Sequence, residues 1–127
     1  MTSKEVRELP YIKISSGMWA VLAHDAAHGG KKEPPNIGMV NDINMVASLL
    51  PFCDAMFVDK EIDHLLNFPE MKKIIVLYNT KIFSKNQKDE FFNYLDDIEK
   101  NIPNDQKQAI KELHGDGYPA PFLEMYQ

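Results

Sequence analysis

The stretch LPFCDAMFVDKE, residues 50–61, is a short apolar run with an acidic residue near each end. Asp54 stands near its start and Asp59 closes it. A near-continuous apolar run of this length is typical of a strand that is buried on both faces, as in a parallel sheet. Parallel α/β sheets bind their ligands at the carboxyl ends of the strands, which is where Asp59 would lie.

Helical patterns flank this strand on both sides. Before it, four apolar residues recur at helical spacing up to Pro51; these are Ile43, Val46, Ala47 and Leu50. We expect this helix to begin near Asn41, with Asn41 or its neighbour as the N-cap. After the strand, Asp59 is expected to cap a short helix that carries Ile62, Leu65 and Leu66.

Further along, residues 80–84 (TKIFS) predict a second strand, and Ser84 and Gln87 have the spacing of a capping box. The helix that they would open carries an apolar stripe formed by Phe91, Leu95, Ile98 and Ile102. A weaker helix is expected over residues 105–113, followed by a tail. This order of elements predicts an α/β fold with a short parallel sheet flanked by helices.

The amino-terminal part predicts one more helix, in GMWAVLAHDAAHGG, residues 17–30. We place its entry at Ser15 and Ser16 and its end at Gly29 and Gly30. Its expected apolar face consists of Trp19, Leu22, Ala23 and Ala26. Residues 31–39 then form a loop, because two prolines and a glycine disfavour regular helix. The expected organisation is an N-terminal helical segment over 1–33, an α/β core over 34–102, and a helix with a tail over 103–127.

The composition limits the classes of function. The chain has 127 residues and a net charge of −5, so no general basic surface indicates nucleic-acid binding, and RNA would need metal ions or a local basic patch. Cys53 is the only cysteine, which excludes a disulfide within the chain. No apolar stretch approaches the ~18 residues of a membrane span, and the start lacks the apolar core of a signal peptide. We therefore expect a cytoplasmic protein that does not enter the membrane.

The motif HDAAH, His24 to His28, places two imidazoles one helical turn apart, as in zinc-binding H-E-x-x-H sequences. At about 100° per residue, His24 and His28 fall about 140° and 180° from Trp19. Both side chains would then face water. We expect them to be exposed and free of metal.

Asp42 and Asp59 are the candidate metal ligands and catalytic residues. Mg²⁺ and Mn²⁺ prefer oxygen ligands and usually bind one or two carboxylates together with water. A helix that returns into a strand can bring Asp42 and Asp59 to one edge of the sheet, within the ~4 to 8 Å that one or two cations span. Glu61 would be a further ligand, and Asp54 would lie at the opposite edge. The alternative is that Asp42 and Asp59 only cap helices.

Residues 41–62 (NDINMVASLLPFCDAMFVDKEI) resemble the later half of a PIN-like domain, and residues 80–99 (TKIFSKNQKDEFFNYLDDIE) are similar to the strand and last helix that follow there. The resemblance implies a nuclease that depends on Mg²⁺ or Mn²⁺ and often cleaves RNA. Asp42 and Asp59 match the later two acids of its metal site. The first thirty residues depart from the pattern, because they contain no apolar strand that ends in Asp.

Two hypotheses about function follow. In the first, the chain is the C-terminal part of a PIN-like nuclease that lacks the first strand, is weak or inactive alone, and acts on single-stranded RNA once an N-terminal segment is supplied. In the second, it is a non-catalytic interaction module that kept the scaffold and self-associates, for example through exposed sheet edges.

Overall fold

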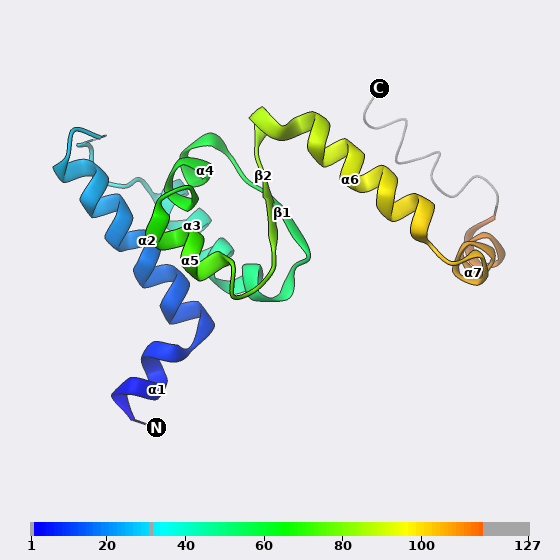
Figure 1. Cartoon of the computed structure of the whole chain (residues 1–127), viewed down its shortest axis with the longest axis horizontal. Helices are drawn as coiled ribbons and strands as arrows, with labels where there is room; N and C mark the ends of the chain where they lie inside the picture. The colour runs from blue at the N-terminus through cyan, green and yellow to red at the C-terminus, as the bar shows by residue number, and fades with distance from the viewer. Residues whose placement is uncertain (1, 31, 116–127) are drawn as a thin grey trace. The chain divides into compact units, whose positions relative to one another are not determined.

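The computed structural model describes residues 2–30 and 32–115, and the chain divides into two compact units, residues 1–88 and 89–127. In the first unit the elements are α1 (Ser3–Glu8), α2 (Pro10–Ala27), α3 (Ile37–Leu49), the 3₁₀ turn η1 (Leu50–Phe52), β1 (Ala55–Phe57), α4 (Lys60–Leu66), α5 (Pro69–Ile75), β2 (Lys81–Phe83) and the 3₁₀ turn η2 (Lys85–Gln87). The helices α6 (Lys88–Asn101) and α7 (Asn104–His114) follow (Figure 1).

The two strands pair in parallel, with Ala55 opposite Lys81 and Phe57 opposite Phe83. The structure thus has the expected α/β class, a short parallel sheet with helices beside it (Figure 1). The first strand is shorter than the apolar run suggested, because Leu50–Phe52 forms η1 around Pro51, and Phe52 is 85% exposed. Thr80, the residue before β2, forms a hydrogen bond to this turn.

The hydroxyl of Thr80 is buried and donates to the carbonyl oxygen of Leu50 at 2.7 Å. It also lies 3.0 Å from the carbonyl oxygen of Cys53. Both carbonyls belong to the segment that leads into β1, so a single buried side chain holds the start of one strand against the start of the other.

The core of the first unit lies between α2, α3, α4, α5 and the inner face of the sheet. Its buried members are Ile14, Met18, Val21, Ile43, Val46, Ala47, Leu50, Val58, Ile62, Leu65, Leu66 and Met71. The face of α2 is not the expected one, since Trp19 and Leu22 are only partly buried at its border. Helix α2 packs against α3 and α5 within the first unit.

Two helices begin earlier than the sequence suggested. The N-cap of α3 is Asn36, whose side-chain oxygen accepts from the backbone N–H of Met39 at 2.8 Å, and not Asn41. Helix α2 begins at Pro10, so Ser15 and Ser16 lie inside it and do not cap it. A proline is well suited to a first helical position, where no N–H is needed.

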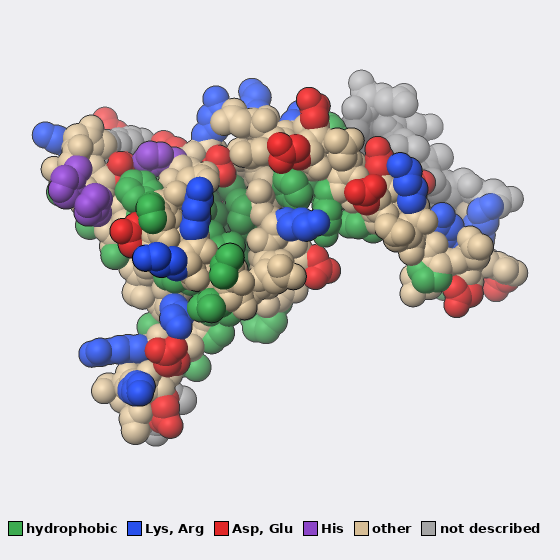
Figure 2. Space-filling model, in the orientation of Figure 1, with side chains coloured by type: hydrophobic (Ala, Val, Ile, Leu, Met, Phe, Trp, Pro, Cys, Tyr) green, Lys and Arg blue, Asp and Glu red, His purple; other side chains and the backbone are tan. Residues whose placement is uncertain are grey.

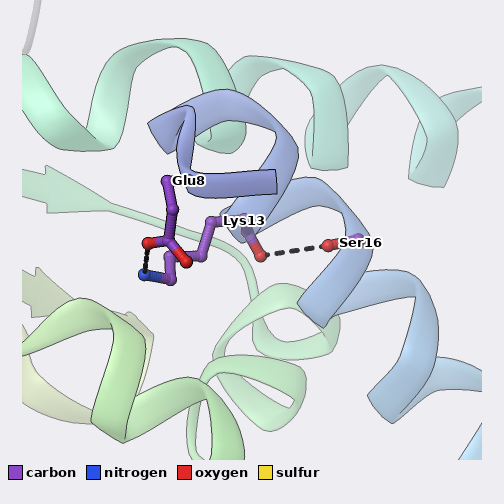
Figure 3. A network of polar contacts seen from close by, with 3 residues as sticks. All are labelled: Glu8, Lys13 and Ser16. Carbon is purple, nitrogen blue, oxygen red and sulfur yellow. Dashed lines mark hydrogen bonds and ion pairs between the residues drawn. The ribbon is translucent and has the colours of Figure 1, made fainter. Parts of the chain in front are cut away.

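An ion pair joins the end of α1 to the first turns of α2 across Pro10 (Figure 3). Lys13 Nζ lies 2.8 Å from Glu8 Oε2, and this hydrogen bond lowers the pKa of Glu8 and raises the pKa of Lys13. The hydroxyl of Ser16 lies 3.3 Å from the carbonyl oxygen of Lys13. Both charged groups are at the surface, so solvent screening keeps the contribution to stability small.

Helix α6 begins as expected, behind a capping box formed by Ser84 and Gln87. Helix α7 confirms the weaker helix and ends at Gly115, which has a φ of 78°. The tail expected after it lies outside the described residues. Within the part of the chain that the structure describes, no helix is both long and apolar enough to cross a bilayer.

Candidate metal-binding carboxylates beside the end of β1

Asp59 follows β1 and Val58 and is the N-cap of α4. Its Oδ1 accepts from the backbone N–H of Ile62 at 2.8 Å. The capping interpretation of Asp59 is therefore confirmed. The side chain is exposed, and a carboxylate that caps through one oxygen keeps lone pairs on the other oxygen for a second ligand.

Asp42 does not cap a helix. It is the sixth residue of α3, and its side chain is half-buried. Within the described ranges, the structure gives this carboxylate neither a hydrogen bond nor an ion pair with another side chain. The capping alternative is thus wrong for Asp42, because Asn36 already fills that position.

A cavity of about 570 Å³ lies between the end of α2, the start of α3 and the start of α4. Its polar lining consists of Asp25, His28, Lys60, Glu61 and His64, and its apolar lining of Leu22, Met39 and Leu65. The expected ligand Glu61 therefore borders an open space, and Asp59 immediately precedes this part of α4. The cavity is mixed in charge, with two carboxylates, one lysine and two imidazoles.

The position of Met39 relates Asp42 to the same cavity. Asp42 follows Met39 by three residues, a spacing that makes the two side chains neighbours on α3, although Asp42 is not itself one of the lining residues. Met39 shares the cavity lining with Lys60, the residue after Asp59. The structure thus brings Met39 and Lys60 to one cavity, whose lining includes neither Asp42 nor Asp59.

Two other acidic residues are placed differently. Asp63 Oδ2 accepts from the buried hydroxyl of Ser84 at 3.0 Å, so this carboxylate ties α4 to the end of β2. Asp54 precedes β1, and its carbonyl oxygen accepts from the N–H of Lys81 at 2.9 Å. It lies at the opposite end of the strand from Asp59, as expected.

The histidines of the HDAAH motif are exposed, as their helical angles predicted. Their rings stack with centroids 4.1 Å apart, and His28 Nδ1 lies 2.8 Å from the carbonyl oxygen of His24. Figure 2 shows histidine side chains gathered over the end of the first unit where α2 terminates. The sequence did not indicate the contact of Asp25 with His64, whose Oδ1 and Nε2 atoms lie 3.3 Å apart.

Residues 2–30 and 32–115 hold no group of three or more His, Cys, Asp or Glu side chains placed to share one metal ion. A cation held by one or two carboxylates and several waters does not require such a group, and Mg²⁺ commonly binds in this way. Among the described residues the structure therefore shows no complete protein cage for a metal ion.

No protein-family model, curated protein or solved structure matches the chain.

Proposed function

We propose that this chain is the later part of a PIN-like nuclease that depends on Mg²⁺ or Mn²⁺ and acts on single-stranded RNA, with Asp42 and Asp59 as its metal ligands. The observation that supports this proposal best is the half-buried Asp42, which caps no helix and follows Met39, a residue of the cavity lining, by three positions on α3. A carboxylate in such a position is costly unless a cation or another partner offsets its charge.

The order of α3, η1 and β1 along the chain also supports Asp42 and Asp59 as a pair of metal ligands. Helix α3 returns into β1 through the short turn η1, and Asp42 lies seven residues, or about 10 Å, before the end of α3. Asp59 lies beyond the carboxyl end of β1. We predict that the two carboxylates approach closely enough to hold one hydrated cation, with Glu61 beside them.

Two carboxylates provide only part of the charge that phosphodiester hydrolysis needs. Such chemistry needs a cation to activate water and a second positive charge at the leaving oxygen, both fixed by several carboxylates. We propose that further acids come from a segment outside these 127 residues. The chain alone should then bind the cation weakly, on the order of millimolar, and cleave little RNA.

Titration with Mn²⁺ tests the metal site directly. The paramagnetic ion should broaden the amide NMR signals around Asp42, Asp59 and Glu61 first. Asp59→Asn should weaken binding about tenfold, because asparagine keeps the helix cap and removes the charge. Asp42→Asn should do the same, whereas Asp54→Asn, at the other end of β1, is the matched control and should change nothing. Broadening that affects the signals around neither Asp42 nor Asp59 would contradict the proposed metal site.

A cleavage assay tests the activity. Labelled single-stranded RNA with Mg²⁺ or Mn²⁺ should be cut slowly by the chain and not at all by Asp59→Asn. Rapid metal-dependent cleavage that Asp59→Asn abolishes would show that the site is complete within 127 residues, against the proposal that a segment is missing.

A non-catalytic interaction module is the second candidate function. It is favoured by apolar side chains that α6 and α7 expose, including Phe92, Leu95, Ile98, Ile110 and Leu113. An exposed apolar face of this kind is characteristic of a docking surface.

A further inference from the structure

Helix α6 is amphipathic and leaves much of its apolar face exposed. Phe91, Leu95 and Ile98 follow one another at spacings of four and three residues, which places them on one stripe of α6, while Ile102, expected on the same stripe, lies just beyond the last helical residue, Asn101. Leu95 is 42% and Ile98 44% exposed. A helix of 14 residues with such a stripe gains most of its stability from packing against another surface.

The part of the chain that includes α6 is much more acidic than the first unit. Residues 89–127 contain three Lys and nine Asp or Glu, whereas residues 1–88 contain eleven Lys or Arg and ten Asp or Glu. On α6, Glu90 and Glu99 fall about 100° and 80° from Phe91 on opposite sides of the stripe. The apolar stripe is therefore bordered by Glu90 on one side and by Glu99 and Lys88 on the other, and because acidic residues predominate in residues 89–127, a fitting partner would be apolar with basic margins.

The first unit has a groove of this kind, which we call the α5–β2 groove. It has a volume of about 390 Å³. Its apolar lining is Leu66, Ile75, Val76 and Ile82, and its charged lining is Lys72, Lys81 and Asp63, of which Asp63 accepts a hydrogen bond from Ser84. Val76 is 76% exposed at its rim. Lysine and hydrophobic side chains lie side by side on this face of the unit (Figure 2).

The lining favours an amphipathic helix over a nucleic acid. Single-stranded nucleic acids are held by aromatic side chains on which bases stack, and no aromatic residue lines the groove. An amphipathic helix docks by placing an apolar face in an apolar groove, and here the two lysines of the groove are opposite in sign to Glu90 and Glu99 of α6. The apolar stripe of α6 and the α5–β2 groove that fits it both belong to this chain.

We propose that the chain self-associates by reciprocal exchange, with α6 of each copy docked in the α5–β2 groove of the other. A reciprocal contact of this kind closes with twofold symmetry and buries the same pair of surfaces twice. A second copy is the occupant because Lys88 begins α6 directly after Gln87, which lines the groove, so the same chain has no linker with which to turn back. This association is independent of the proposed nuclease site.

Analytical ultracentrifugation of the full chain over a wide range of concentrations tests the proposal. A reversible dimer is expected, and it should weaken at high salt because Lys72 and Lys81 face the acidic margins of α6. A chain that stays monomeric at every concentration, including one whose α6 packs on its own first unit, would overturn the proposal.

Two variants locate the contact. Ile98→Asp places a charge on the α6 stripe, and Val76→Asp places one at the rim of the groove. Each should weaken the dimer at least tenfold. Ile37→Asp and Phe52→Asp are matched controls, because Ile37 is 76% and Phe52 85% exposed and neither lines the groove. Both controls should dimerise like the unmodified chain, and circular dichroism should show that all four variants fold.

Mixing the two variants distinguishes this contact from other dimers. The Ile98→Asp chain keeps an intact groove and the Val76→Asp chain keeps an intact α6, so one of the two contacts can form between them. Fluorescence energy transfer between labelled variants should therefore show a heterodimer stronger than either variant's own dimer. If only Ile98→Asp weakens the dimer and mixing restores nothing, then α6 pairs with another α6 and the exchange is wrong.

Discussion

Replacement of Leu65 by alanine should lower the free energy of unfolding by about 2–5 kcal/mol. Leu65 is 1% exposed, belongs to the core and also lines the cavity beside the candidate carboxylates. Its loss removes apolar burial and leaves a void that the short helix α4 can close only by moving. Urea unfolding followed by far-UV circular dichroism measures the change.

Leu77→Ala is the matched control for this substitution. Leu77 is 62% exposed just after α5, so the same deletion should cost no more than about 0.5 kcal/mol. Equal effects of the two substitutions would mean that α4 does not pack as the structure places it, and the arrangement of Asp59 and Glu61 would fail with it.

The candidate site depends on this packing because α4 has only seven residues. A helix of that length is not stable by itself in water. Its direction is fixed by Ile62, Leu65 and Leu66 in the core and by the cap at Asp59. The residue that we propose as a metal ligand therefore also fixes the helix, which is why asparagine is the substitution that separates the two roles.

Local signals in the sequence predicted local structure well. The cap at Asp59 and the capping box of Ser84 and Gln87 involve residues three apart, so their geometry is set within one helical turn. The burial of Ile62 and Leu65 also followed from helical spacing on one short element. The second strand was recognisable because β-branched and aromatic residues are bounded there by Thr80 and Ser84.

Features that depend on distant neighbours were not predictable in this way. Helix α2 carries apolar residues around much of its circumference, so spacing alone could not decide whether Met18 or Trp19 faces the core. The choice is made by α3 and α5, which pack against it. Likewise the apolar run 50–58 gave no sign that Phe52 would be exposed, since the 3₁₀ turn around Pro51 rotates it away from the strand.

The surroundings of the candidate carboxylates show the same limit. Asp25 and His64 are 39 residues apart in the sequence, and only the packing of α2 against α4 brings them to one cavity. The acids themselves could be picked out, because one ended an apolar run and the other preceded it on a helix. Their relation to the histidines required the tertiary structure.

Gly17→Leu should destabilise the first unit by about 1–3 kcal/mol through overpacking between α2 and α5. A Cβ atom at Gly17 would lie 2.9 Å from Met71 Sδ and 2.9 Å from Ile74 Cδ1. These are the ends of side chains, so a single methyl group could be accommodated by small shifts. A leucine could not, because Met71 is fully buried and has no space into which to withdraw.

The helical preference of leucine over glycine, about 1 kcal/mol, opposes this loss and must be measured separately. Ala20→Leu serves as the control, since Ala20 is exposed three residues further along α2 and leucine there adds bulk only toward solvent. Urea unfolding followed by the fluorescence of Trp19, which lies at the border of the core, reports on this helix directly. The free energy of unfolding of Ala20→Leu should stay within about 0.5 kcal/mol of that of the unmodified chain, whereas that of Gly17→Leu should be clearly lower. If the two variants unfold at the same urea concentration, α2 and α5 do not approach as closely as the structure places them, and α2 would no longer be part of the core that supports the candidate site.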